Sequence, residues 1–302
     1  MTTGQKTHAP VAIFAYERLD HLEKTLDALR DNEGARETEL NVFSDGPREH
    51  NAEHVENVRR YLHKIDGFKK VNLFERDQNM GLAANIKDGI SKVFLEHDRI
   101  IVLEDDIVTS PNFLLYMNAA LQYYDKNEKV GHINSWSYPL REKSQQDFFF
   151  LDIMNCWGWA TWKDRWSLYN DDAEHWANTL SWKQKNHLDL DGSGEFWPQV
   201  SANLRGKKRT WAIFWLLSLF QNGLLSLTPR TSYSQNVGHD GSGENSRETE
   251  KYFVKEINHC AHFHFPDAPI LDEHMRKNIE QFIKSQDQIA KRFAKKLRSF
   301  TY

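Results

Sequence analysis

The chain has 302 residues and a formal net charge of −4, from 39 Lys and Arg against 43 Asp and Glu. This length is ample for one large α/β domain or two small ones, and the charge balance argues against nucleic-acid binding. Cys156 and Cys260 are too few for a secreted disulfide framework. The polar residues 1–10 and the short apolar run at 211–219 lead us to expect a cytoplasmic protein.

Strands and helices alternate through the first half of the chain. Apolar runs predict strands at 10–15, 40–43, 71–74 and 100–103, and helical spacing predicts helices at 18–30, 53–65, 81–95 and 111–124. This alternation predicts a mostly parallel, doubly wound sheet. Right-handed crossovers then bring the ends of these strands to one edge of the sheet.

The second half changes character. We predict strands at 130–137, 148–151 and 224–228, short helices and loops at 164–206, a helix at 209–222, and a glycine-rich loop at 238–243. Residues 259–264 alternate like a strand with His262 and His264 on one face, and we favour this reading over a metal site. Asp189 and Asp191 form an acidic pair that no apolar strand precedes, so we expect a loop there.

Three carboxylates follow the fourth strand. The apolar run 100–103 leads directly into Glu104, Asp105 and Asp106. Unpaired buried carboxylates are prohibitively costly, so the group must face water or a cation. Such oxygens at the carboxyl end of a strand suit Mg²⁺ or Mn²⁺ together with substrate phosphates. The alternative is a solvated acidic turn.

The first strand is not followed by a glycine-rich phosphate loop, which argues against a nicotinamide cofactor and a P-loop. A nucleotide could still bind through its base and a metal. Asp45 could accept the N3–H of uracil, although an Asp before Gly-Pro more often caps a turn. Arg18 could bind a phosphate as a fork donor, or it could be solvated at the start of a helix.

Several phrases resemble GT-A-fold glycosyltransferases over about residues 9–245. They are Ala15-Tyr16-Glu17-Arg18, Ser44-Asp45-Gly46 and 102–113, the last similar to the metal-binding region of N-acetylglucosaminyltransferase I. The phrase 79–85 is similar to bacterial family 2 glycosyltransferases, and 157–159 and 236–243 are similar to members that build surface polysaccharides.

The resemblance implies a UDP-linked sugar donor, a saccharide or lipid-linked acceptor, and Mn²⁺ or Mg²⁺ on the diphosphate. It implies a GT-A-type α/β fold with a nucleotide-sugar half at 9–125, an acceptor-side half at 126–270 and a basic C-terminal helix at 271–302. It places Asp106 on the metal. The donor residues that it indicates are Ala15, Tyr16, Arg18, Asp45, Asn85, Glu104 and Asp105.

The catalytic base is less clear from the sequence. An inverting transferase needs a carboxylate near the acceptor hydroxyl. Related families often carry an Asp between two tryptophans where this chain has Ala212. The substitutes are Asp164, Glu195 and Asp240, of which we prefer Asp164. For each of them a surface role is the alternative.

Further residues have two readings. Trp159, with Trp157 and Trp162, could stack on a sugar ring or pack in the core. His239 could bind the metal or the diphosphate, or be an exposed loop residue. The basic tail at 274–302 could lie on the inner face of an anionic membrane or be a solvated helix.

We therefore expect an inverting, metal-dependent hexosyl- or N-acetylhexosaminyltransferase of bacterial capsule or lipopolysaccharide synthesis. The alternatives are a non-catalytic carbohydrate-binding protein on the same fold and a sugar nucleotidyltransferase. The second of these usually has a basic glycine-rich loop near its N-terminus, which this chain lacks.

Overall fold

The computed structural model of the protein describes residues 8–242 and 248–285. Its elements are β1 (Val11–Ala15), α1 (Leu19–Arg30), η1 (Ala35–Glu37), β2 (Glu39–Ser44), η2 (Glu49–Asn51), α2 (Ala52–Leu62), β3 (Lys70–Glu75), α3 (Leu82–Glu96), β4 (Arg99–Glu104), β5 (Ile107–Thr109), α4 (Phe113–Tyr123), β6 (Val130–Asn134), β7 (Phe148–Leu151), β8 (Trp159–Trp162), α5 (Lys163–Trp166), α6 (Ala173–Thr179), α7 (Trp182–Leu188), α8 (Trp197–Leu204), α9 (Ala212–Gln221), β9 (Leu225–Pro229) and β10 (Ser234–Asn236). Residues 273–285 form a further helix.

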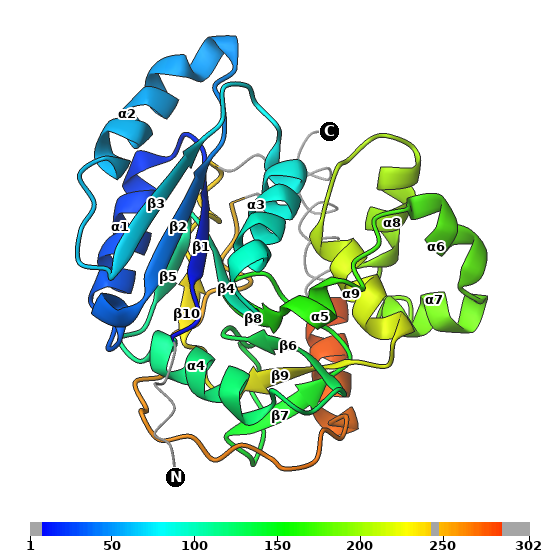
Figure 1. Ribbon diagram of the computed structural model, residues 1–302. Coiled ribbons are helices and arrows are strands. Elements are labelled where there is room, and N and C mark those ends of the chain that lie inside the picture. Colours follow the sequence, from blue (N-terminus) through cyan, green and yellow to red (C-terminus); the bar gives the residue numbers. More distant parts are fainter. Residues whose placement is uncertain (1–7, 243–247, 286–302) are drawn as a thin grey trace, which may run out of the picture.

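Within the described ranges, one eight-stranded sheet has the order β3-β2-β1-β4-β8-β6-β9-β7 (Figure 1). Strands β3, β2, β1 and β4 are parallel, so their carboxyl ends meet at one edge. Strand β8 runs antiparallel to β4 and β6, and β9 runs parallel to β6 and antiparallel to β7. A separate ribbon pairs β5 with β10. The predicted α/β class, with a mostly parallel sheet between helices, is confirmed.

Strands β1, β2 and β4 are buried on both faces, whereas the edge strand β3 is only partly buried. Phe14 and Val102 pack in a core around α3 and α9, whereas Ile13 and Leu103 pack in a second core around α1, α2 and α4. Neighbouring residues of a strand point to opposite faces, so a strand covered on both sides needs a continuous apolar run. Each fully buried side chain of this size contributes about 1.5–3 kcal/mol.

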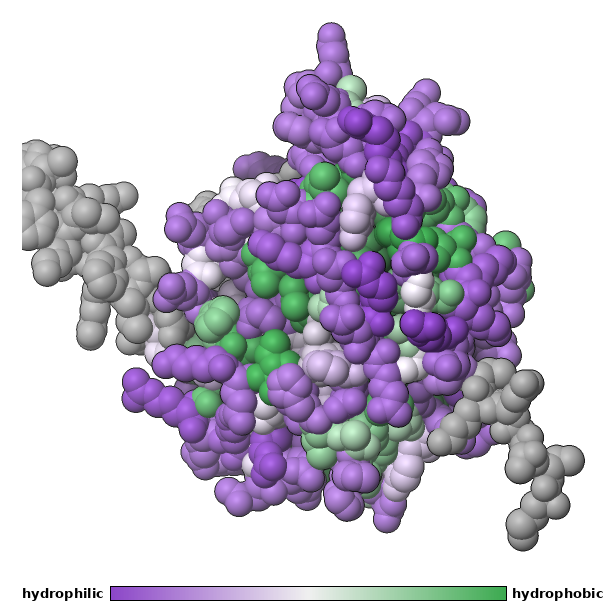
Figure 2. Space-filling view, turned by 90° about the vertical axis from the view of Figure 1, so that its left-hand side faces the viewer, coloured by the Kyte–Doolittle hydropathy of each residue, from purple (hydrophilic) through white to green (hydrophobic). Residues whose placement is uncertain are grey.

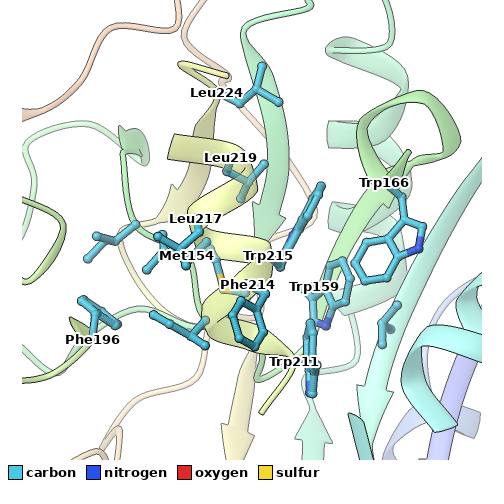
Figure 3. Packing of buried hydrophobic residues seen from close by; sticks show 14 of the residues in the cluster. Met154, Trp159, Trp166, Phe196, Trp211, Phe214, Trp215, Leu217, Leu219 and Leu224 are labelled. Carbon is cyan, nitrogen blue, oxygen red and sulfur yellow. The ribbon is translucent and has the colours of Figure 1, made fainter. Parts of the chain in front are cut away.

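Tryptophans fill much of the first core (Figure 3). Trp159 on β8 is 0% exposed and stacks between His132 and Trp211, at centroid distances of 5.1 and 5.4 Å. The expectation that Trp159 contacts a sugar is therefore wrong for this conformation, because its ring has no surface open to a ligand. Trp162 is also buried, and its Nε1–H donates to the carbonyl of Leu121.

The predicted strand at 259–264 does not form, although the alternation is present. His262 and His264 are exposed, whereas Phe263 is half-buried and packs against Tyr116. The thiol of Cys260 bonds locally to the backbone oxygen of His262, at 3.1 Å. An alternating pattern needs only an extended backbone, whereas a strand also needs a neighbouring edge to pair with.

The described part of the C-terminal helix packs on the protein. Ile279 and Ile283 are buried, and Arg276 Nε donates to Asp152 Oδ1 at 3.0 Å while its Nη2 donates to the carbonyl of His187 at 2.5 Å. Most of the basic tail, from residue 286 on, lies outside the described residues, so its contact with a membrane stays a prediction.

The molecular surface in Figure 2 is largely hydrophilic, and its apolar residues form small separate groups. Within the described residues, no helix combines the length and the apolar character that a bilayer span needs.

A buried histidine lies among the tryptophans of the first core. His132 on β6 is 0% exposed, and the Nε1–H of Trp215 donates to its Nδ1 at 3.0 Å. An indole N–H can only donate, so Nδ1 carries no proton and Nε2–H donates to the carbonyl of Asn155 at 3.1 Å. The imidazole is therefore neutral, and burial lowers the pKa of His132 to about 3.

This histidine makes stability depend on pH. The unfolded chain takes up the proton near pH 6.5 and the folded chain only near pH 3. The free energy of unfolding should therefore fall between these values as the pH drops, by about 1.4 kcal/mol per pH unit from this group. We expect His132→Gln to lose that part of the slope in urea unfolding at pH 6.5, 5.5 and 4.5. His54→Gln, at an exposed position, is the control, and equal slopes for His132→Gln and wild type would contradict the assignment.

Candidate functional site

A pocket of about 410 Å³ opens at the carboxyl ends of β1, β2 and β4. One wall comes from the first half of the chain and the other from loops of the second half. The lining residues are Phe14, Ala15, Tyr16, Glu17, Arg18, Asp45, Arg48, Asn79, Gly81, Leu82, Asn85, Glu104, Asp105, Asp106, Cys156, Trp157, Glu195, Gln199, Arg209, Thr210, Trp211, Ala212, Asn236, His239 and Ser242.

The acidic turn after β4 is held by Arg18. This residue precedes α1, and its Nη2 forms ion pairs with Asp105 and with Asp106, the second at 2.8 Å. Thr25 on α1 donates its hydroxyl to the backbone oxygen of Asp105 at 2.9 Å. The β1–α1 junction therefore fixes the turn in which the three carboxylates lie together.

The turn carries more negative charge than its arginine neutralises. Burial, with the charges of Asp106 and Asp105, raises the pKa of Glu104 to about 8. Burial also raises the pKa of Asp105 to about 6, although Arg18 opposes the shift. Burial lowers the pKa of Arg18, but attraction by the two aspartates outweighs this and leaves it above the ordinary value. Three carboxylates beside one guanidinium favour a further cation.

The geometry at Asp106 fits a divalent metal. Its Oδ1 is buried and has no hydrogen-bond partner among the described residues. Its Oδ2 faces Gly238 so closely that a Cβ there would lie 2.0 Å away, which explains the glycine. Among the described residues, no three or more His, Cys, Asp or Glu side chains are arranged so that together they could hold a metal ion. A metal would thus take most of its ligands from phosphates and water, as Mg²⁺ commonly does.

Asp45 is held by the loop before α3. Its Oδ1 accepts from the backbone N–H groups of Gly46 and Met80, both at 2.8 Å, and its Oδ2 accepts from Gly81 N–H at 2.9 Å. A fourth and longer bond, 3.3 Å, comes from the side-chain amide of Asn79. Asp45 therefore organises the turn as well as lining the pocket.

Three more residues expected at the donor also line the pocket. Ala15 and Tyr16 end the first strand, and the hydroxyl of Tyr16 accepts from the side chain of Asn51 at 2.6 Å. Asn85 on α3 donates to the carbonyl of Phe43 at 3.2 Å and accepts from Arg76 at 3.1 Å. The amide of Asn85 thus ties α3 to the sheet beside the pocket.

The three candidate bases lie in different surroundings. Glu195 lines the pocket, where its Oε1 accepts from the hydroxyl of Tyr252 at 3.0 Å. Asp164 is absent from the pocket wall and pairs with the adjacent Arg165 at 2.6 Å. Asp240 also lies outside the pocket wall, and hydrogen bonds from Ser242 lower its pKa to about 2, which makes it a weak base.

His239 lines the pocket near the acidic turn. Its ring contacts the edge of Trp157 at a centroid distance of 5.1 Å and lies 5.6 Å from that of Tyr252. The preceding loop is fixed to the turn, because the N–H of Val237 donates to the carbonyl of Asp106 at 2.9 Å. Part of the predicted glycine-rich loop, from residue 243, lies outside the described residues.

Sequence reasoning missed Arg209 and Cys156 as pocket residues. Arg209 ends a run of basic residues just before the apolar helix α9, and that run was the available signal. Cys156 precedes the aromatic segment, and nothing in the sequence distinguishes it from a core cysteine.

Comparison with known proteins gives a family. The glycosyl transferase family 2 profile matches residues 11–181. An α-1,3-mannosyl-glycoprotein 2-β-N-acetylglucosaminyltransferase from Arabidopsis thaliana is 26% identical over 199 residues, which are 61% of this chain and 44% of that protein. The chain thus spans less than half the length of this curated relative.

Two solved structures are similar to this chain over part of its length. The mannosyltransferase PcManGT from Pyrobaculum calidifontis, in complex with GDP-Man and Mn²⁺, has a TM-score of 0.41 at 12% identity, covering 72% of this chain and 71% of its own. Residues 1–349 of S. aureus TarS have a TM-score of 0.42 at 9% identity, covering 74% and 59%. The family match extends over more than half of the sequence, and the chain therefore belongs to glycosyl transferase family 2.

Proposed function

We propose that the protein transfers a sugar from a UDP-linked donor to a hydroxyl of a saccharide acceptor, with Mn²⁺ or Mg²⁺ at Asp106. One observation carries this proposal: the Oδ1 of Asp106, in the acidic turn at the pocket, is buried and has no hydrogen-bond partner within residues 8–242 and 248–285. Inversion at the anomeric carbon, a lipid-linked acceptor, membrane contact and a role in capsule or lipopolysaccharide synthesis stay predictions from the sequence.

The residues of the pocket have different roles in the proposed reaction. A bound cation would neutralise the diphosphate as it leaves. Arg18 holds the acidic turn with Nη2, while its Nη1 is buried without a partner among the described residues and can donate to a phosphate oxygen. Glu104 and Asp105 lie beside Arg18, and their oxygens can accept hydrogen bonds from hydroxyl groups of the donor's sugars.

Asp106→Asn tests the metal site. This nearly isosteric change removes the negative charge, so we expect Mn²⁺-dependent affinity for UDP to fall by at least about 10- to 100-fold, with the fold intact. Calorimetric titration of UDP with and without Mn²⁺ measures the effect, and circular dichroism checks folding. Asp164→Asn, outside the pocket wall, is the matched control. Wild-type affinity in Asp106→Asn would refute the metal role.

We propose Glu195 as the general base, in place of the Asp164 preferred from sequence. Glu195 is the candidate of the three that lines the pocket. The hydroxyl of Tyr252 can orient its carboxylate, and Lys251 Nζ lies 3.8 Å from Oε2. The carboxylate would take the proton of the acceptor hydroxyl as that oxygen attacks the anomeric carbon.

Glu195→Gln keeps the size of the side chain and its bond to Tyr252 but removes the base. We expect the turnover number to fall about 10²- to 10⁴-fold with UDP affinity unchanged. Release of UDP from a panel of UDP-sugars, with candidate acceptors, measures turnover. Asp164→Asn should keep its turnover, and the reverse outcome would restore Asp164. UDP binding without any turnover by wild type would favour the non-catalytic binding protein.

Asp45 is proposed to recognise the uracil ring. The longest of its four hydrogen bonds, from Asn79, is the one that uracil N3–H can replace. Asp45→Asn should weaken UDP binding and reduce its preference over CDP, because cytosine N3 is an acceptor and lacks this proton. Asn79→Ala, which removes the competing donor, should keep the preference. An unchanged UDP-to-CDP ratio in Asp45→Asn would leave Asp45 with its turn-organising role alone.

A further inference from the structure

A run of unpaired cations lies between α8 and α9. Four of the five residues 205–209 are basic, and we call this segment the basic bend; its cations are Arg205, Lys207, Lys208 and Arg209. All four are exposed. Across the described ranges, their side chains form no ion pair or hydrogen bond. Four neighbouring cations without partners in the described part of the chain create a local positive potential that attracts anions.

The backbone of the bend is nevertheless fixed. Asn203 accepts from the N–H of Thr210 at 3.0 Å and donates to its hydroxyl at 2.7 Å. The N–H groups of Lys207 and Lys208 both donate to the carbonyl of Ala202, at 2.8 and 3.3 Å. A fixed backbone that presents unengaged cations has already met part of the entropic cost of binding an anion.

The bend leads into the pocket from outside. Arg209 lines the pocket, as Trp211 and Glu195 do, whereas Lys207 and Lys208 are not among the lining residues. The other two arginines of the pocket already have partners. Arg18 pairs with the acidic turn, and Arg48 donates to Asn79 at 3.3 Å. The basic bend therefore forms a positively charged path to the wall that carries the proposed base.

We propose that the acceptor is an anionic glycan and that the basic bend guides it into the pocket. This inference rests on the proposed function and adds the chemical class of its acceptor. An anionic glycan can place one of its charges at Arg209 in the pocket and the neighbouring charges at Lys207 and Lys208. A flat membrane surface cannot reach into the pocket in this way. The proposed function places the donor diphosphate at the acidic turn, beside Arg18 and Asp106, which leaves the basic bend for the acceptor.

The test compares an anionic and a neutral polymer of the same sugar. Fluorescent dextran sulfate and dextran are titrated against the full chain over a range of salt concentrations. The variants Lys207→Ser/Lys208→Ser and Arg209→Ala remove cations of the basic bend. The control Lys64→Ser/Lys69→Ser removes two exposed lysines that precede the edge strand β3. UDP with Mn²⁺ and anionic phosphatidylglycerol vesicles are measured on the same proteins.

We expect wild type to bind dextran sulfate and not dextran. Lys207→Ser/Lys208→Ser and Arg209→Ala should each bind at least about tenfold more weakly, with a salt slope lower by roughly one per lost contact. Lys64→Ser/Lys69→Ser should bind like wild type, and all variants should keep UDP affinity.

Other outcomes would overturn the inference in distinguishable ways. Equal losses in both lysine pairs would mean non-specific attraction. Loss of UDP affinity in Arg209→Ala would assign this arginine to the donor. Loss of vesicle binding alone would assign the bend to a membrane. Failure of wild type to bind UDP would refute the proposed donor while the polymer measurements still stand.

Discussion

The ion pairs of Arg18 with Asp105 and Asp106 hold the candidate site together. Three carboxylates at the end of β4 repel one another, and burial strengthens that repulsion because water no longer screens it. One guanidinium, placed at the β1–α1 junction, offsets part of it and fixes the turn. The pairing is incomplete, since Asp106 Oδ1 stays buried without a partner in the described residues. The same interaction that stabilises the turn therefore leaves room for a second cation and for a phosphate beside it.

Sheet topology decides which residues can join this turn. Parallel strands β1, β2 and β4 end at one edge, so Tyr16, Asp45 and Glu104 meet although nearly ninety residues separate them in sequence. The rest of the lining has a different origin. Its members come from the segment before β8, from α8 and α9 with the loops that precede them, and from β10 and the loop after it, and side-chain hydrogen bonds fix several of these loops. One wall thus follows from the sheet, and the other depends on local contacts.

This difference explains how much the sequence could predict. Strands β1–β4 and helices α1–α4 were predicted within a few residues, because buried strands and amphipathic helices have distinct periods, whereas the short strand β5 was not predicted. Their convergence followed from parallel connections, and the family match confirms the class of protein. The failures lie in the second half. Periodicity cannot tell a tryptophan stacked in the core, such as Trp159, from one facing a ligand. Nor does it show that Asp164 pairs with its neighbour Arg165, or that residues 259–264 have no edge to pair with.

Hydrogen bonds from polar side chains fix the loops of the second half of the chain that line the pocket. Asp189, in an acidic pair that resembles a metal motif, accepts from the N–H groups of Gly194, Phe196 and Trp197, and so places the loop that carries Glu195. Asn203 fixes the basic bend in the same way. Asp189 also seats Phe196, which is buried in the core around α3 and α9, whereas Asn203 acts on the exposed basic bend. The exposed side chains of the basic bend can therefore change with little loss of stability, whereas the acidic turn is constrained by buried charge.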